Sequence, residues 1–175
     1  MSGHSHWAGI KHKKEITDKK RGKEFSKLLK LVSAAAQTEP DSNFNPRLRT
    51  AVEKARAAGV TADKIENAIA RASESKENLE ELVFEAYGPG GVAIMIEALS
   101  SNRNRMVQEI KKILSDHEGK WAEIGSVTWA FESTAEGKKA KFPQAISEED
   151  AKKLDVLVDA LEDHDDVQNV YTSAD

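Results

Sequence analysis

The 175-residue chain contains no cysteine. Disulfide bonds, cysteine-ligated zinc sites and thiol nucleophiles are therefore excluded, and nothing marks an oxidising compartment. The sequence also lacks any apolar run approaching the ~20 residues that a bilayer requires, and its opening lacks the apolar core of a signal peptide. We therefore expect a cytoplasmic protein with no membrane partner, built as one domain or two small ones.

Positive charge is scarce at one end of the chain and abundant at the other. Residues 1–30 hold nine lysines and arginines against three carboxylates, a net charge of +6. Residues 145–175 hold two lysines against ten carboxylates, a net charge of −8. The overall net charge of −4 hides this asymmetry. A locally basic surface attracts polyanions even on an acidic molecule, so the basic end is the candidate for binding nucleic acid.

The first 75 residues predict a helical domain behind an N-terminal arm. In residues 17–37, Phe25, Leu28, Leu29 and Val32 recur at the spacing of an amphipathic helix. Asn45 and Pro46 are typical of the start of a second helix, RLRTAVEKARAA. Thr61 is the predicted cap of a third helix, ADKIENAIARA, and the polar stretch 72–78 then predicts a linker.

Residues 79–175 predict an α+β domain. A β-hairpin is predicted by the period of two in LVFEAYG and GVAIMIEAL, which lie on either side of the turn GPGG. The next predicted elements are a helix, NRNRMVQEIKKILSDHEG, and then a strand, SVTWAFE. The stretch 133–144 has no period and predicts a linker. A capping box at Ser147 and Asp150 opens another helix, and VQNVY can close the sheet. The predicted fold is a small antiparallel-rich α/β sandwich, ββαβ…αβ, with helices on one face.

The basic opening, MSGHSHWAGIKHKK, places a tryptophan among histidines and lysines. An aromatic ring in a cationic segment is suited to stacking on bases while lysines bind phosphates; Trp7 could equally anchor the chain end on the helical domain. On the first helix, the face opposite Phe25 carries a stripe made of Lys20, Lys23, Lys27 and Lys30. Such a stripe is either a solvated face or a phosphate-binding surface, and the preceding lysines favour binding.

Paired arginines stand at two predicted helix starts, Arg47 with Arg49 and Arg103 with Arg105. A helix N-terminus carries about half a positive charge, so cations there are unfavourable unless an anion joins them. Phosphate binding would account for both pairs, and so would surface ion pairs with the acidic half of the chain.

Other chemistry is poorly supported by the sequence. His4, His6 and His12 could ligate a metal, but no HExxH-like pair supports them, and the nearest carboxylates lie beside lysines. GPGG lacks the Lys-Ser/Thr of a phosphate-binding loop and favours a tight turn. We therefore expect no metal, no cofactor, no catalytic residue and no small-molecule substrate. A metal-dependent nuclease and an adaptor that docks through the acidic helix at 148–163 are the remaining alternatives.

Several long motifs resemble the YebC family: GHSHWAGIKHKK, KRGKEFSKL, NPRLR, YGPGGVA and NRNR, together with the closing stretch ISEEDAKKLDVLVDALEDHDDVQNVY. The resemblance covers most of the chain. Members of that family usually carry a further small α/β domain where this chain has only 133–144, so the resemblance implies a two-domain short form.

The resemblance implies a soluble factor in gene expression, either a DNA-binding transcriptional regulator or a ribosome-associated translation factor that helps synthesis through stretches such as consecutive prolines. The sequence shows no helix-turn-helix or zinc finger with base-reading residues, which favours ribosomal RNA over DNA as the partner. In that interpretation the nucleic-acid-binding residues are Trp7, Lys11, His12, Lys13, Lys14, Lys19, Lys20, Arg21, Lys23, Lys27, Arg47, Arg49, Arg103 and Arg105.

Overall fold

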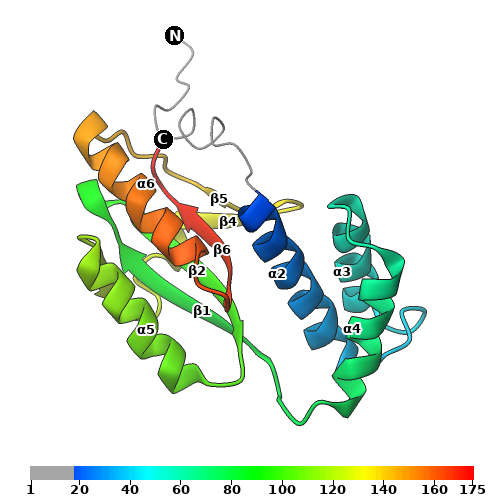
Figure 1. Cartoon of the computed structure of the whole chain (residues 1–175). Coiled ribbons are helices and arrows are strands. Elements are labelled where there is room, and N and C mark those ends of the chain that lie inside the picture. Colours follow the sequence, from blue (N-terminus) through cyan, green and yellow to red (C-terminus); the bar gives the residue numbers. More distant parts are fainter. Residues whose placement is uncertain (1–17) are drawn as a thin grey trace. The chain divides into compact units, whose positions relative to one another are not determined.

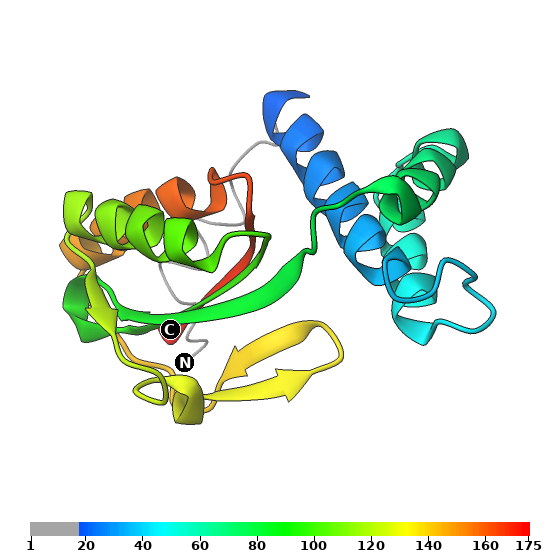
Figure 2. The ribbon, with the colours of Figure 1, turned by 90° about the horizontal axis from the view of Figure 1, so that it is seen from below.

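The computed structural model describes residues 18–175, drawn as a ribbon in Figures 1 and 2. The described residues form two compact units. The helical unit holds the described residues up to Glu81 together with Leu99–Ser101, and the α/β unit holds Leu82–Ala98 and Asn102–Asp175. None of the helices within residues 18–175 has the length and apolarity needed to cross a bilayer.

The helical unit consists of three helices, as the apolar spacing predicts. Helix α2 (Asp18–Ala36) packs against both α3 (Pro46–Ala57) and α4 (Ala62–Glu74). Their apolar stripes meet in one core, in which Val32, Leu48 and Ala55 are fully buried. Burying these side chains is the main stabilisation of helices this short, because isolated helices of 12 to 19 residues are marginal in water.

Asn45 connects the end of α2 to the start of α3. Its side-chain oxygen accepts a hydrogen bond from the Leu48 amide at 3.0 Å, which satisfies one free N–H of the first turn. Its side-chain nitrogen donates to the carbonyls of Ala35 at 2.8 Å and Glu39 at 2.7 Å. The residue is 6% exposed, so one buried amide fixes where α3 begins relative to the last turn of α2.

The α/β unit is built on a four-stranded sheet with the order β3-β1-β2-β6. Its strands are β1 (Glu80–Tyr87), β2 (Ala93–Ser100), β3 (Lys120–Ala122) and β6 (Val167–Thr172). Strand β3 runs antiparallel to β1, and β6 runs antiparallel to β2. GPGG forms the predicted hairpin turn, a short 3-10 segment (Pro89–Gly91) across which the Gly88 amide donates to the Val92 carbonyl at 2.9 Å.

Helices α5 (Arg103–Asp116) and α6 (Glu148–Glu162) cover one face of this sheet (Figure 2). Strand β2 contributes to two cores, since its side chains alternate between faces. Ile94 and Ile96 pack in the core that the helices cover. Ala93 and Met95 pack in a smaller core on the other face, with Phe131 of the hairpin described next. The unit therefore has three layers, and the α+β class expected from the sequence is confirmed.

The third layer corrects two predictions. The stretch 133–144 is not a structureless linker, because β4 (Phe131–Thr134) and β5 (Gly137–Ala140) form a hairpin in which Phe131 pairs with Ala140. SVTWAFE is not one strand, since Thr128–Ala130 is a 3-10 turn and β4 begins only at Phe131. The strand that follows α5 in the sheet is the three-residue β3, which the sequence analysis missed.

A buried glutamate gives the physical reason for that turn. Glu85 of β1 is 4% exposed and accepts hydrogen bonds from the amides of Val127 at 2.9 Å and Thr128 at 2.7 Å, from the Thr128 hydroxyl at 2.6 Å, and from the Gly125 amide. Burial alone would raise the pKa of Glu85, but these hydrogen bonds, that of Thr128 first, lower it below its ordinary value. Successive amides that converge on one carboxylate cannot also form a strand ladder.

Candidate nucleic-acid interface

Helix α2 carries the basic stripe that the sequence predicts. Between residues 18 and 30 the helix holds six lysines and arginines against Asp18 and Glu24, a net charge of +4. Lys19, Lys20 and Arg21 are exposed, and Lys23 and Lys27 are half-buried. Their placement follows from the apolar stripe, because the core takes the opposite face of the helix and leaves the lysines on the outer one.

The stripe is long enough to contact several phosphates at once. Lys20 and Lys30 are ten residues apart, which corresponds to about 15 Å along a helix. One strand of a B-form duplex presents about four phosphates over that distance. The other predicted contacts at the basic end, Trp7, Lys11, His12, Lys13 and Lys14, lie outside the described residues, as do His4 and His6.

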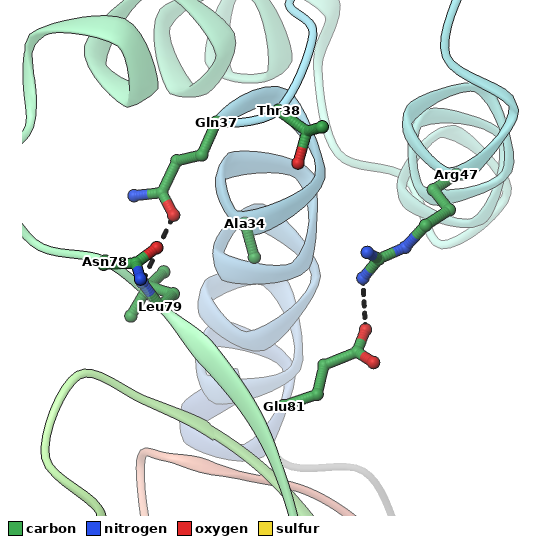
Figure 3. A pocket seen from close by; sticks show the side chains of 7 residues that line it. All are labelled: Ala34, Gln37, Thr38, Arg47, Asn78, Leu79 and Glu81. Atoms are coloured by element: carbon green, nitrogen blue, oxygen red, sulfur yellow. Dashed lines mark hydrogen bonds and ion pairs between the residues drawn. The ribbon is translucent and has the colours of Figure 1, made fainter.

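Arg47 lies at a small polar pocket in the helical unit (Figure 3). The pocket has a volume of about 230 Å³ and is lined by Ala34, Gln37, Thr38, Arg47, Asn78, Leu79 and Glu81. Arg47 forms an ion pair there with Glu81, and both side chains are more than half exposed, at 62% and 64%. Such exposed pairs contribute about 0–1 kcal/mol. A phosphate could therefore replace Glu81 as the partner of Arg47 at little cost in stability.

Arg49 has a different role. Its guanidinium donates hydrogen bonds to the carbonyls of Ser42 at 3.1 Å and Asn43 at 3.2 Å. These bonds hold the loop before α3 against the first turn of that helix. The outer surface of Arg49 remains exposed, so it can still add positive potential beside Arg47.

The Arg47–Arg49 pair is near one end of the lysine stripe and far from the other. The side chain of Asn45 hydrogen-bonds to the carbonyl of Ala35, which places the start of α3 beside the last turn of α2. Along a helix, Ala35 is about 8 Å from Lys30 and about 22 Å from Lys20, the two ends of the stripe. One extended polyanion could contact the whole stripe and the arginines, whereas a single phosphate group could not.

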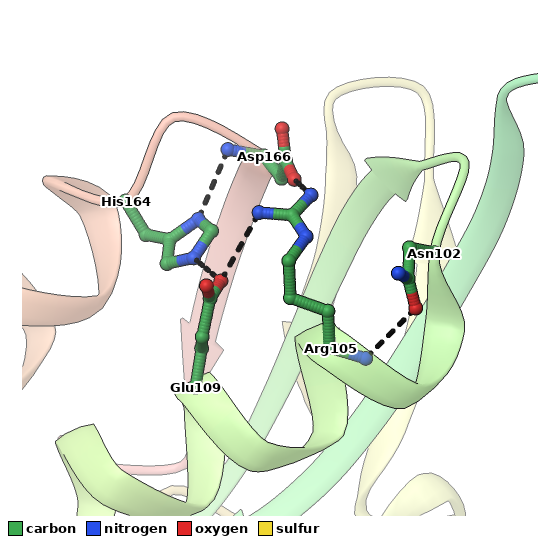
Figure 4. A network of polar contacts seen from close by, with 5 residues as sticks. All are labelled: Asn102, Arg105, Glu109, His164 and Asp166. Carbon is green, nitrogen blue, oxygen red and sulfur yellow. Dashed lines mark hydrogen bonds and ion pairs between the residues drawn. The ribbon is translucent and has the colours of Figure 1, made fainter. Parts of the chain in front are cut away.

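Arg105 belongs to a polar network at the start of α5 (Figure 4). Its guanidinium pairs with Asp166 at 2.5 Å and with Glu109 at 3.4 Å. His164 lies 2.6 Å from Glu109 through Nε2, and its Nδ1 accepts a hydrogen bond from the Asp166 amide at 3.0 Å. Since Nδ1 accepts, Nε2 carries the proton and donates it to Glu109.

This network holds α5 against the turn between α6 and β6. The hydrogen bond to Asp166, helped by the charges of Asp166 and Glu109, raises the pKa of Arg105 above its ordinary value despite partial burial. The guanidinium of Arg105 is therefore already paired with carboxylates, which agrees with the surface ion pairs that the sequence offered as the alternative to phosphate binding. The side chain of neighbouring Arg103 is exposed and forms no hydrogen bond or ion pair with another residue in the 18–175 range. Of this pair, Arg103 is the better candidate for a phosphate contact.

Acid, base and cation in one cluster also raise the question of catalysis. Arg105, Glu109, His164 and Asp166 bond mainly to one another, and the four contain no hydroxyl or thiol nucleophile. Within the described part of the chain, no group of three or more histidine, aspartate or glutamate side chains could hold a metal ion. The network acts as a structural link, and sequence reasoning could not foresee it because Arg105 and Asp166 are 61 residues apart.

Comparison with known protein families gives matches along nearly the whole chain. Residues 5–75 match the domain described as "TACO1/YebC protein N-terminal domain". Residues 79–142 and 133–174 match the region described as "TACO1/YebC second and third domain". The second match comes in two overlapping pieces that meet at the β4–β5 hairpin.

Individual proteins agree with these matches. A "probable transcriptional regulatory protein" of Koribacter versatilis is 50% identical over 133 residues, which cover 75% of this chain and 54% of that protein. One from Pseudothermotoga lettingae is 41% identical over an alignment covering 100% of this chain and 71% of the relative. The chain thus spans only about half the length of some curated relatives.

A solved structure supports the same relationship. The crystal structure of a conserved hypothetical protein from Aquifex aeolicus matches with a TM-score of 0.83 and 31% sequence identity. The match covers 98% of this chain and 97% of that one. Both the helical unit and the α/β unit described above therefore have counterparts in an experimental structure.

Proposed function

Because the chain belongs to the TACO1/YebC family, we propose that it is a nucleic-acid-binding regulator of gene expression. In this proposal it acts as a translation factor that binds ribosomal RNA and assists synthesis through difficult stretches such as consecutive prolines. It works without chemistry of its own, by binding one arrangement of the ribosome more tightly than the others and so raising the population of that arrangement.

The lysine stripe of α2 is the observation that carries the proposal. The stripe combines a net charge of +4 over residues 18–30 with a helix fixed by packing against α3 and α4. Positive charges held in a fixed row bind a polyanion without first losing conformational freedom of the backbone. The exposed arginines Arg47 and Arg103 supply further contacts for the phosphate backbone.

The kind of cation supports RNA over a specific DNA site. Lysine is a point charge that suits phosphates, whereas reading base edges relies on arginine forks and on amide side chains placed in a groove. The basic stripe of α2 is built of lysines, and Arg49, at the start of α3, is held by two loop carbonyls. Contacts to phosphate position a protein on nucleic acid without reading its sequence.

Co-sedimentation with ribosomes tests this function. Wild-type protein would be compared with a variant in which Lys20, Lys23 and Lys27 are changed to glutamate. The matched control changes three exposed lysines elsewhere in the helical unit to glutamate, namely Lys54, Lys64 and Lys76. We expect wild type and control to migrate with ribosomes after DNase treatment and the stripe variant to remain at the top of the gradient. Wild-type protein that never migrates with ribosomes would refute the translational role.

A DNA-binding transcriptional regulator is the second candidate, because relatives bear the name "probable transcriptional regulatory protein". This function requires a preference for particular duplex sequences beyond salt-sensitive nonspecific affinity. Selection of bound fragments from random duplex DNA measures that preference. Enrichment of a defined motif, with no ribosome association, would replace the translational proposal with the transcriptional one.

A further inference from the structure

Two aromatic rings lie exposed on the α/β unit, at the base of the β4–β5 hairpin. Trp129 is 62% exposed and Phe142 is 66% exposed. Their ring centroids are 6.1 Å apart and the ring planes are tilted by 44°. We call these two residues the aromatic platform. Figure 2 shows that the hairpin lies across the sheet from α5 and α6, so the helices leave this side of the unit uncovered.

The polar edges around the platform are satisfied internally. The indole Nε1 of Trp129 donates to the carbonyl of Ser126 at 2.8 Å. The hydroxyl of Tyr87 reaches the same carbonyl at 3.4 Å. Because its only hydrogen-bond donor is already used, the exposed Trp129 ring offers a ligand its flat π surface. The tilt between the two rings leaves their faces unstacked on each other.

Lysines flank the platform. Lys141 directly precedes Phe142, and its amide donates to the carbonyl of Ala130 at 2.8 Å, which holds it beside Trp129. Lys139 lies two residues earlier, on β5, directly opposite Glu132 of β4. The other hairpin carboxylate, Glu136, lies at the turn. Residues 131–142 hold three lysines against these two carboxylates, a net charge of +1.

We propose that the aromatic platform stacks unpaired bases of single-stranded RNA while Lys139 and Lys141 contact the adjoining phosphates. The proposal rests on the proposed function in that its ligand is RNA, and it adds a second contact surface to the α2 stripe. An aromatic face beside lysines is the combination that grips single strands without regard to sequence. Two aromatic side chains supply at most roughly 300–500 Å² of contact, below the roughly 800 Å² that each partner contributes to a stable protein interface.

Binding of an oligouridylate of about a dozen nucleotides, followed by fluorescence anisotropy, tests the platform. The first variant combines Trp129→Ala and Phe142→Ala, and the matched control combines Trp129→Phe and Phe142→Tyr, which keeps both rings. We expect the alanine variant to lose about 5- to 150-fold in affinity per stacked base and the aromatic control to keep most of it. The dependence of affinity on salt should stay parallel to that of wild type, since no phosphate contact is removed.

Three results would overturn the platform. Unchanged affinity of the alanine variant would show that the rings do not stack on RNA. Equal losses for the alanine variant and the aromatic control would point to a disturbed hairpin in place of lost stacking. Self-association of the wild type that the alanine variant loses, with RNA affinity unchanged, would identify a second copy as the occupant.

A further variant separates this proposal from the proposed function. Neutralising Lys20, Lys23 and Lys27 to glutamine should weaken binding to single-stranded and duplex RNA alike. If the lysine variant loses affinity and the aromatic variant does not, the platform proposal is refuted and the role of the α2 stripe is retained. Failure of the wild type to bind any RNA sinks both.

Discussion

Neutralising the α2 stripe gives the sharpest quantitative prediction. In a variant with Lys20, Lys23 and Lys27 changed to glutamine, three proposed phosphate contacts disappear. Each contact with a single strand contributes about 0.7 to the slope of log affinity against log salt, so we expect the slope to fall by about 2. If the contacts act through release of counterions, affinity falls about 50-fold at 0.15 M salt and about 500-fold at 0.05 M.

The substitution is designed to leave the fold intact. Lysine and glutamine have similar helix propensities, and the substituted side chains lie on the face of α2 opposite its core contacts. Far-ultraviolet circular dichroism and the thermal midpoint would check that the variant keeps its helices. The charge-matched control changes Lys54, Lys64 and Lys76 to glutamine.

The assay is a salt titration of RNA binding for all three proteins. The control should retain the wild-type slope, because its lysines lie outside the stripe. Parallel slopes for the wild type and the stripe variant would refute the phosphate-contact reasoning. Equal loss in both variants would mean that only net charge matters, and the stripe would then be no more than a solvated face.

Three further predictions concern stability and the roles of single residues. Glu85→Gln should lower the free energy of unfolding by about 1–3 kcal/mol at neutral pH, because the buried amides lose their carboxylate partner. Since the pKa of Glu85 is lowered in the fold from its ordinary value of 4.5, the extra stability of wild type should be complete above about pH 4.5. It should vanish as the pH falls through the lowered pKa. A gap in denaturant midpoint that persists in acid would contradict this. Asn45→Ala should cost about 2–4 kcal/mol, and Asn45→Asp, which keeps only the cap, should fall between it and wild type in urea melts. Arg105→Gln should lower the thermal midpoint of unfolding, because Arg105 holds the network with Asp166. Arg103→Gln should leave the midpoint unchanged and weaken RNA binding. The reverse pattern would give Arg103 the structural role and Arg105 the phosphate contact.

Local sequence signals sufficed to predict the helices. The starts of α3 and α6 follow Asn45 and Ser147, whose side chains make the expected capping bonds. Thr61 stands at the start of α4 as predicted, but its side chain makes no capping bond. The hairpin β4–β5 was missed because little of it faces a core. Phe131 is its only buried residue, with Ala140 partly buried opposite it. A strand with so few inward positions shows no period of two.

The candidate site divides in the same way. The α2 stripe could be predicted because one helix face is a matter of spacing alone. The difference between Arg103 and Arg105 could not be predicted, since it depends on Asp166, which folding brings to α5 from the start of β6. The exposure of Trp129 was equally hidden, because the turn that presents it forms around Glu85, more than 40 residues earlier.

Strand β2, with helices packed on one face and a hairpin on the other, is left with almost no position open to neutral substitution. Seven of its eight residues are buried, and the eighth, Glu97, lies within hydrogen-bonding distance of Asn169 and Tyr171 of β6. On a half-exposed strand, alternate residues can change to any polar type, but in β2 residues 93–96 and Ala98 all pack in one core or the other. As relatives diverge, AIMIEALS should therefore be among the last segments to lose its likeness, and it can fix the alignment of members that share little else.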